Sequence, residues 1–419
     1  MTAARRAAAV DERAADDGDG RDPALDGRVA AVHGQVRPTL LLAAGFALAA
    51  PAAAVVPHRT GPWLPLHLFL VGALLLAISG ATQMFAVTWA AGPPAPDRLV
   101  AAQRMLLAGG VAGLALVREF GGSSALLVGA GSAVAVALAL LAVALRGIVR
   151  RAVQRRFDVT WRWYRSALAV GGAGVGLGIA LAAGTVSNGS TAPVRDAHVL
   201  LNVLGLVGFV IAGTLPFFVS TQARMRMSPR AGTGLQDGVR RILVTGLLLA
   251  WTGGLAGQTR LTGFGLLLYA AGLAALAGLL PRPGRRQLRW AGPRLLQLGC
   301  GLLWWFGSVL AMAVCLLLGD TSLPQGALLA LVVGGYGQIL MASLAYLGPV
   351  LRGGGHQRLA AGFAATASRG GLVLGNGAAL ALATGQRGVG AAVLALWLLD
   401  TAGHARALLS RGIQDGVPG

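Results

Sequence analysis

The chain has 419 residues, of which 55% are hydrophobic and only 12% are charged, and its formal net charge is +20. A soluble domain carries about 25% charged residues, so this composition excludes an ordinary water-exposed surface. The positive charge does not indicate a nucleic-acid partner, because the arginines lie in short gaps between apolar runs and not on one face of a soluble domain. The composition predicts an all-α polytopic membrane protein.

Residues 1–37 are polar, rich in Ala, Asp and Arg, and have no apolar period. This predicts a disordered cytoplasmic tail. The run from Leu40 to Ala50, followed by Pro51 and three alanines, offers an alternative, because it is similar to a signal peptide with a small-residue cleavage site. The segment before it is long and acidic, whereas a signal peptide begins with a short basic region. We therefore expect a first membrane span here.

Twelve apolar runs follow one another along residues 38–408, and we expect each to be a transmembrane helix. About 20 residues are needed to cross a hydrocarbon core of roughly 30 Å, and most of the runs are that long. They cover residues 38–56, 64–90, 99–118, 122–145, 164–185, 194–221, 239–257, 261–280, 295–318, 324–350, 370–385 and 388–408. Residues 409–419 are expected to form a second cytoplasmic tail.

The distribution of arginine predicts the orientation of this bundle. All 35 basic residues are arginine, and 30 of them lie in alternate gaps between the apolar runs, while only Arg59, Arg118, Arg195, Arg260 and Arg387 lie in the other gaps. Cytoplasmic loops of membrane proteins retain arginine. We therefore expect a plasma-membrane protein with both termini in the cytoplasm, and a lipid bilayer as its first partner.

Two groups of residues have structural interpretations. Small residues at helical spacing allow close helix packing in lipid, and Gly172, Gly174, Gly176 and Gly178 lie together in the fifth run. Phe157, Trp161, Trp163 and Tyr164 lie amid the arginines just before it, which predicts an aromatic belt at the membrane interface.

Few ionisable residues lie inside the apolar runs, and these are the candidates for function because burying them is costly. Asp400 and His404 are one turn apart near the end of the twelfth run and predict an ion pair at the inner interface. His67 and His198 lie near the start of the second and sixth runs, so we expect both imidazoles at the same depth near the outer face. Asn202 lies one turn below His198 and could orient its ring. Two imidazoles at one depth could bind haem iron or copper, or they could be two separate hydrogen-bonded histidines.

Three segments carry a resemblance to a known family. They are HLFLVGALLLAISGATQMFAVTWAAGP from His67 to Pro93, RFDVTWRWYRSA from Arg156 to Ala167, and RDAHVLLNVLGLVGFVIAGTLPFFVSTQARMRM from Arg195 to Met227. They resemble the membrane module that precedes multicopper oxidase or copper nitrite reductase domains in some actinobacterial fusion proteins. The likeness covers residues 38–230 well and the remainder loosely. It implies a multicopper oxidase or nitrite reductase as a partner, since no copper domain follows in this chain.

More distantly, twelve spans with histidines at the outer ends of spans two and six resemble the haem–copper oxidase subunit I and its NnrS-like relatives. In that family the second-span histidine binds haem and the sixth-span histidine binds copper, so the resemblance implies such roles for His67 and His198. The chain departs from the family in span seven (Val239 to Gly257), which has no histidine. Span ten also has none and offers Tyr336 and Gln338. The usual residues of an oxygen- or nitric-oxide-reducing centre are therefore absent, and we expect no catalysis of that kind.

Three functions remain open at this point. The first is a degenerate haem–copper-type protein that binds haem b or copper through His67 and His198 and serves a copper oxidase, nitrite or nitric oxide pathway as an electron-transfer or accessory component. The second is a non-redox scaffold or assembly partner that keeps the bundle without a cofactor. The third is a permease for a small solute, for which the absence of mid-span carboxylates disfavours cation or proton coupling.

Overall fold

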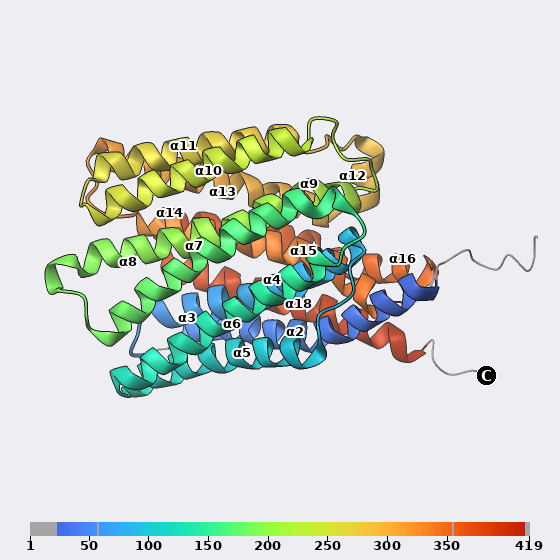
Figure 1. The fold of residues 1–419 in the computed structure, drawn as a ribbon, viewed down its shortest axis with the longest axis horizontal. Coiled ribbons are helices and arrows are strands. Elements are labelled where there is room, and N and C mark those ends of the chain that lie inside the picture. Colours follow the sequence, from blue (N-terminus) through green and yellow to red (C-terminus); the bar gives the residue numbers. More distant parts are fainter. Residues whose placement is uncertain (1–22, 57, 354–355, 415–419) are drawn as a thin grey trace, which may run out of the picture.

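The structure, a computed structural model, describes residues 23–56, 58–353 and 356–414. Over these residues the chain forms helices and no strand, and most of the helices lie side by side in one bundle (Figure 1). Leucine and alanine, which favour helices, dominate the long elements, and glycines with positive φ end two of them. These are Gly121 after α5, with φ 75°, and Gly184 after α7, with φ 68°.

The helices fall into three consecutive units of the same order. The first comprises α2 (Pro23–Val55), α3 (Trp63–His67) with the π-helix η1 (Leu68–Leu74) and α4 (Leu75–Ala90), then α5 (Asp97–Phe120) and α6 (Ser124–Arg150). The second comprises the 3-10 turn η2 (Arg155–Phe157) and α7 (Asp158–Ala183), the 3-10 turn η3 (Asn188–Ser190) and α8 (Thr191–Leu200) with the π-helix η4 (Leu201–Val207) and α9 (Gly208–Gln222), then α10 (Thr233–Leu255) and α11 (Thr259–Leu279). The third comprises α12 (Arg285–Ala291), α13 (Pro293–Leu318), α14 (Gln325–Ala330) with the π-helix η5 (Leu331–Gly337) and α15 (Gln338–Arg352), then α16 (His356–Ala365), α17 (Arg369–Ala383) and α18 (Arg387–Gln414).

The π-helices show that these units are repeats. Each is seven residues long, begins with leucine and has glycine as its fifth residue, at Gly72, Gly205 and Gly335. A Cβ at Gly72 would lie 2.6 Å from Phe46 of α2, and one at Gly205 would lie 2.7 Å from Val170 of α7. In each of these units the glycine therefore lets the second span press against the first.

The three π-containing spans form the centre of the bundle. In its most apolar 18-residue stretch, the helix Thr191–Gln222 is 100% buried, Gln325–Arg352 is 61% buried and Trp63–Ala90 is 56% buried, more than any other candidate span. The remaining spans surround them, and α18 packs against α2 to close the ring. Side chains on these three central spans therefore lie close to one another in the interior of the bundle.

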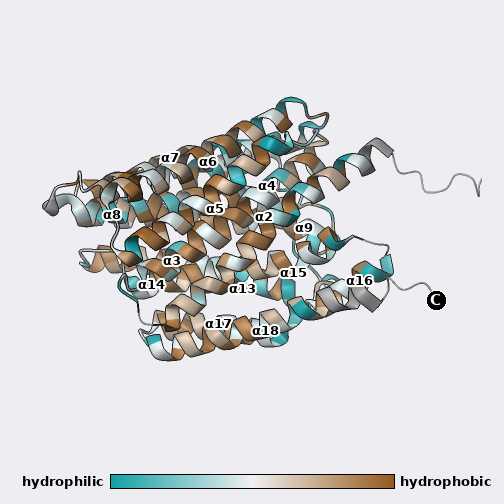
Figure 2. Cartoon of the chain, turned by 90° about the horizontal axis from the view of Figure 1, so that it is seen from below, coloured by the Kyte–Doolittle hydropathy of each residue, from teal (hydrophilic) through white to brown (hydrophobic). Residues whose placement is uncertain are grey.

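Within the described residues, ten helices are long and apolar enough to cross a membrane. Every range expected as a span holds helix, but two of those helices are not among the ten. α10 carries Asp237, Arg240 and Arg241 in its first three turns, and α17 has only 15 residues. Apolar residues dominate the middle of the bundle and polar residues its ends (Figure 2), as expected for a multi-pass membrane protein.

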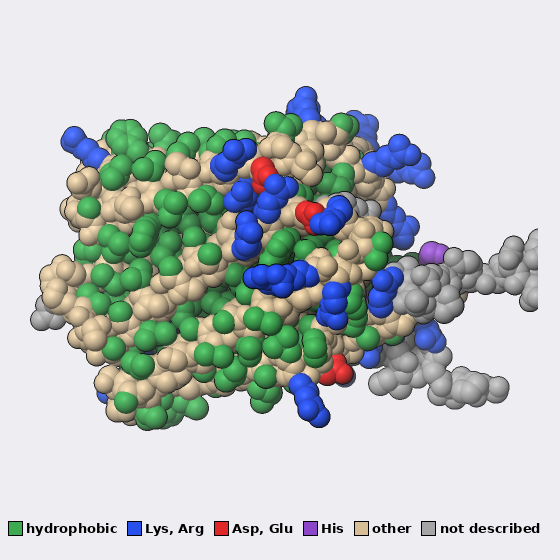
Figure 3. All heavy atoms as spheres, in the orientation of Figure 1, with side chains coloured by type: hydrophobic (Ala, Val, Ile, Leu, Met, Phe, Trp, Pro, Cys, Tyr) green, Lys and Arg blue, Asp and Glu red, His purple; other side chains and the backbone are tan. Residues whose placement is uncertain are grey.

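The arginines gather at one end of the bundle. Figure 3 shows the blue side chains crowded toward the end that also holds the start of α2 and the end of α18, with few at the opposite end. This agrees with the alternation read from the sequence.

Two expectations about the polar segments need correction. The tail expected over residues 1–37 becomes helical at Pro23, because Val32 and Val36 are buried and Val36 packs on Gly80 of α4; residues 1–22 lie outside the described part. Likewise α18 extends through Gln414 into the expected second tail, and residues 415–419 are not described.

The aromatic belt expected before α7 is also wrong. Phe157, Trp163 and Tyr164 are at most 1% exposed, and only Trp161 is partly exposed. Trp163 fits against Gly213 of α9, where a Cβ would lie 2.4 Å from it. These buried side chains therefore pack inside the protein, with Trp163 joining α7 to α9, and do not face lipid.

Candidate functional site

His67 ends α3, directly before the first π-helix, and its ring is held in place on one side. Its Nδ1 lies 2.8 Å from the carbonyl oxygen of Trp63. A carbonyl only accepts hydrogen bonds, so Nδ1 carries the proton and Nε2 keeps a free lone pair. The Trp63 indole stacks on the imidazole, with centroids 4.0 Å apart and planes at 24°.

His198 lies near the end of α8, just before the second π-helix, and is fixed in the same way. Its Nδ1 lies 2.7 Å from the carbonyl oxygen of Gly174 on α7, so this nitrogen also donates and Nε2 is free. The expected role of Asn202 needs correction. Its Nδ2 donates to the carbonyl of His198 at 2.8 Å, whereas the 3.3 Å approach to Nδ1 joins two donors and is not a hydrogen bond. Gly174, and not Asn202, therefore orients the ring.

Glycines of α7 make this arrangement possible. A Cβ at Gly174 would lie 2.5 Å from Nδ2 of Asn202, and one at Gly178 would lie 2.7 Å from Cε1 of His198. Both distances are shorter than a van der Waals contact, so only glycine allows α7 to approach this closely. Gly172 and Gly176 of the same helix face open space. Of the four glycines expected to serve helix packing, Gly174 and Gly178 therefore contact the site, and Gly172 and Gly176 do not.

The two imidazoles lie close to each other, His67 at the end of α3 and His198 near the end of α8. Their centroids are 6.5 Å apart and their planes are 11° from parallel. Both rings are partly exposed. One metal ion bound at about 2 Å by two imidazole nitrogens needs ring centroids roughly 6 Å apart. The expected juxtaposition of the two imidazoles is therefore present, and their centroid separation is close to that of two imidazoles that share one metal ion.

No third ligand joins this pair among the described residues, where no group of three or more His, Cys, Asp or Glu side chains gathers. Two histidines alone would suit a metal that takes two protein ligands, such as haem iron or Cu(I). They do not suit a structural zinc ion, which takes four.

Two tyrosines brace the π-helix below His198, a role that the sequence did not indicate for Tyr269 or for Tyr336. Tyr269 of α11 donates to the carbonyl of Leu204 at 2.8 Å, and Tyr336 of η5 donates to that of Val203 at 2.7 Å. Both are fully buried. A π-helix shifts the backbone ladder by one residue and is frequently found at functional sites. Tyr336 is therefore engaged in holding the backbone and is not aimed at the histidines.

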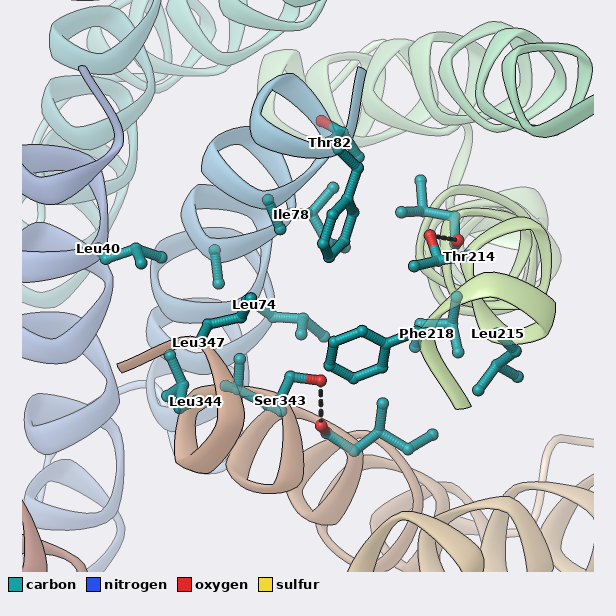
Figure 4. A pocket seen from close by; sticks show the side chains of 17 residues that line it. Leu40, Leu74, Ile78, Thr82, Thr214, Leu215, Phe218, Ser343, Leu344 and Leu347 are labelled. Atoms are coloured by element: carbon teal, nitrogen blue, oxygen red, sulfur yellow. Dashed lines mark hydrogen bonds between the residues drawn. The ribbon is translucent and has the colours of Figure 1, made fainter. Parts of the chain in front are cut away.

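Two cavities lie away from the histidine pair. The first, of about 80 Å³, lies between the three central spans and α2 (Figure 4). It is almost wholly apolar, because the hydroxyls of Thr214 and Ser343 bind carbonyls of their own helices at 2.7 Å. The second, of about 690 Å³, lies between α13, α14 and α17. Neither adds a ligand to the histidines.

The pair expected at the inner end is also present. His404 Nδ1 lies 3.6 Å from Oδ2 of Asp400, and Ser368 donates to the same carboxylate at 2.6 Å. These contacts join α18 to the start of α17. They account for Asp400 as a structural residue.

Comparison of the chain with protein-family models and with curated proteins finds no match in either.

Proposed function

We propose that the protein binds haem b or copper between His67 and His198 and serves a copper oxidase or nitrite reductase as an electron-transfer or accessory component. The observation that carries the proposal is the pair of near-parallel imidazoles 6.5 Å apart, each with Nδ1 bound to a backbone carbonyl. Metal-binding histidines commonly donate their second nitrogen in this way, which fixes the tautomer and directs the other nitrogen to the metal.

The surrounding residues of the chain would orient the two imidazole rings and would not take part in catalysis. The carbonyls of Trp63 and Gly174 orient the rings, and the Trp63 indole covers one face of His67. The bound metal would supply a one-electron redox couple. Because α10 and the span α14–α15 carry no histidine, we infer electron transfer and not reduction of oxygen or nitric oxide.

We further propose that all twelve helical runs cross the plasma membrane, in a haem–copper-oxidase-like bundle. The three-unit order supports this count, because α10 and α17 are each the third span of their unit, the place that α5 takes in the first unit, and α5 is long and apolar enough to cross a membrane. The arginine-rich end would face the cytoplasm and hold both termini.

An absorption spectrum and metal analysis of the purified full-length protein test the proposal. We expect either a Soret band or about one copper per chain, and loss of that signal in His67→Ala and in His198→Ala. His356→Ala is the matched control, because this histidine is the first residue of α16 and is not part of the pair. A colourless and metal-free protein, after expression with haem and copper supplied, contradicts the proposal.

The second candidate is a scaffold without a cofactor. It is favoured by the fact that both rings already make hydrogen bonds and that Trp63 and the α7 glycines pack against them. It predicts that His67→Ala and His198→Ala lose stability but still bind the partner oxidase. Co-purification of the partner with each variant distinguishes the two functions.

A further inference from the structure

A buried arginine without an acceptor lies at the arginine-rich end of the bundle. Arg294 is the second residue of α13, and only 5% of it is exposed. Its Nε and Nη2 are buried and have no hydrogen-bond partner. Burying a charge without a partner costs several kcal/mol, so a missing anion is the first explanation to consider.

Aromatic rings surround this guanidinium but cannot satisfy it. Its central carbon lies 4.3 Å from the ring centroid of Phe363, 5.8 Å from that of Trp290 and 5.9 Å from that of Tyr346. Such contacts attract the cation through the faces of the rings. They offer no acceptor to the N–H groups at the edge of the guanidinium. The indole Nε1 of Trp290 is a further buried donor without a partner.

A second arginine lies on the same indole. Arg224 follows α9 with φ 50°, and its guanidinium carbon lies 3.6 Å from the ring centroid of Trp290. Arg224 is exposed, so it forms the open edge of the cluster. Neither arginine has an ion pair with a carboxylate of the described residues.

The surroundings strengthen this excess of positive charge. The segments 223–232 and 280–296 contain no Asp or Glu. Their other arginines are all exposed; they are Arg226, Arg230, Arg282, Arg285, Arg286 and Arg289.

We propose that Arg224, Trp290 and Arg294 bind the phosphate of an anionic phospholipid. A phosphate oxygen accepts several N–H bonds at once, and the planar guanidinium can donate two of them in parallel. The phosphate enters at the exposed Arg224 and meets the donors of Trp290 and Arg294 behind it. The headgroup region of the cytoplasmic leaflet is rich in anionic lipid and lies at the level of this arginine-rich end. The site is independent of the histidine pair.

Native mass spectrometry of the full chain, released from nanodiscs, tests this site. Nanodiscs of equal phosphatidylglycerol and phosphatidylcholine content should give protein that retains phosphatidylglycerol preferentially. Arg224→Gln should lower that retention about fivefold or more. Arg285→Gln removes the same charge from an exposed residue of α12 and should change retention less than twofold. Arg294→Lys keeps the charge without the planar fork and should also lower retention, which keeps the test valid if Arg294→Gln fails to fold.

Three outcomes would overturn the proposal. Equal losses in Arg224→Gln and Arg285→Gln would mean that general charge attracts the lipid. Equal retention of phosphatidylcholine would mean that no anion is recognised. Displacement of the lipid by millimolar inorganic phosphate, with a matching thermal stabilisation, would assign the site to a free ion instead.

Discussion

A methyl group added to α7 beside His198 should lower the free energy of unfolding, whereas one added to the same helix away from His198 should not. Gly178→Ala places a Cβ 2.7 Å from Cε1 and 2.9 Å from Nδ1 of His198. The ring is held by the Gly174 carbonyl, so it cannot turn aside without breaking that hydrogen bond. Overpacking of this kind costs about 1–3 kcal/mol, and we expect that loss in the free energy of unfolding.

Gly172→Ala and Gly176→Ala are the matched controls on the same helix. Neither Cβ would meet an atom within 4 Å. Because alanine favours helix over glycine by up to about 1 kcal/mol, both controls should be neutral or stabilising. Unfolding by SDS titration in mixed micelles measures these differences.

The same variants test the proposed metal site. A ring displaced by Gly178→Ala should lower cofactor occupancy about tenfold or more, which corresponds to about 1.4 kcal/mol of binding free energy. Stability and occupancy in Gly178→Ala that equal those of Gly172→Ala would refute the argument that close approach of α7 positions His198.

Three further predictions can be checked independently. Tyr336→Phe leaves a buried carbonyl of η4 with one hydrogen bond fewer and should lower the free energy of unfolding by about 1–2 kcal/mol in the same SDS assay; an unchanged midpoint would contradict the bracing role. With both native cysteines replaced by alanine, Arg260→Cys should react with a membrane-impermeant maleimide in intact cells and Arg285→Cys only after lysis, and the reverse pattern would invert the orientation. The carbonyls of Val56 and Gly61, and then Glu119, raise the pKa of His58, so its NMR titration should have a midpoint above 6.5; its stabilising contribution is present at low pH and is lost as the pH rises through that midpoint.

The local sequence signals predicted much of this fold. Apolar runs of about 20 residues were expected to be helices, and each of the twelve ranges holds helix. Helical spacing and span direction placed His67 and His198 at one depth, and the structure brings their ring centroids within 6.5 Å of each other. Their role as ligands stays a proposal.

The repeat of three units was missed, although a signal existed. Aligning Gly72 with Gly205 also aligns Ala91 with Arg224, the two non-glycine residues with positive φ in the described chain. Comparing the two halves of the chain could not detect a repeat of three units. The shared signal is also short, because the remaining apolar positions accept any of several residues.

The prediction of an aromatic belt over residues 157–164 was wrong for a different reason. Arginine and aromatic side chains mark a membrane interface when they face lipid, but spacing along the chain does not say which neighbour a side chain faces. Trp163 is buried only because Gly213 of α9 leaves room for it.

Membrane residence and the crowding of arginine at one end were readable from the chain alone, because transfer of a segment into lipid depends mainly on the sum of its own residues. The lateral positions of the spans could not be read in this way. They depend on pairs of surfaces from distant segments, such as Gly178 against His198 and Tyr336 against the carbonyl of Val203. Tertiary packing therefore decided that the two imidazoles lie close to each other, and that two arginines share one indole at the opposite end.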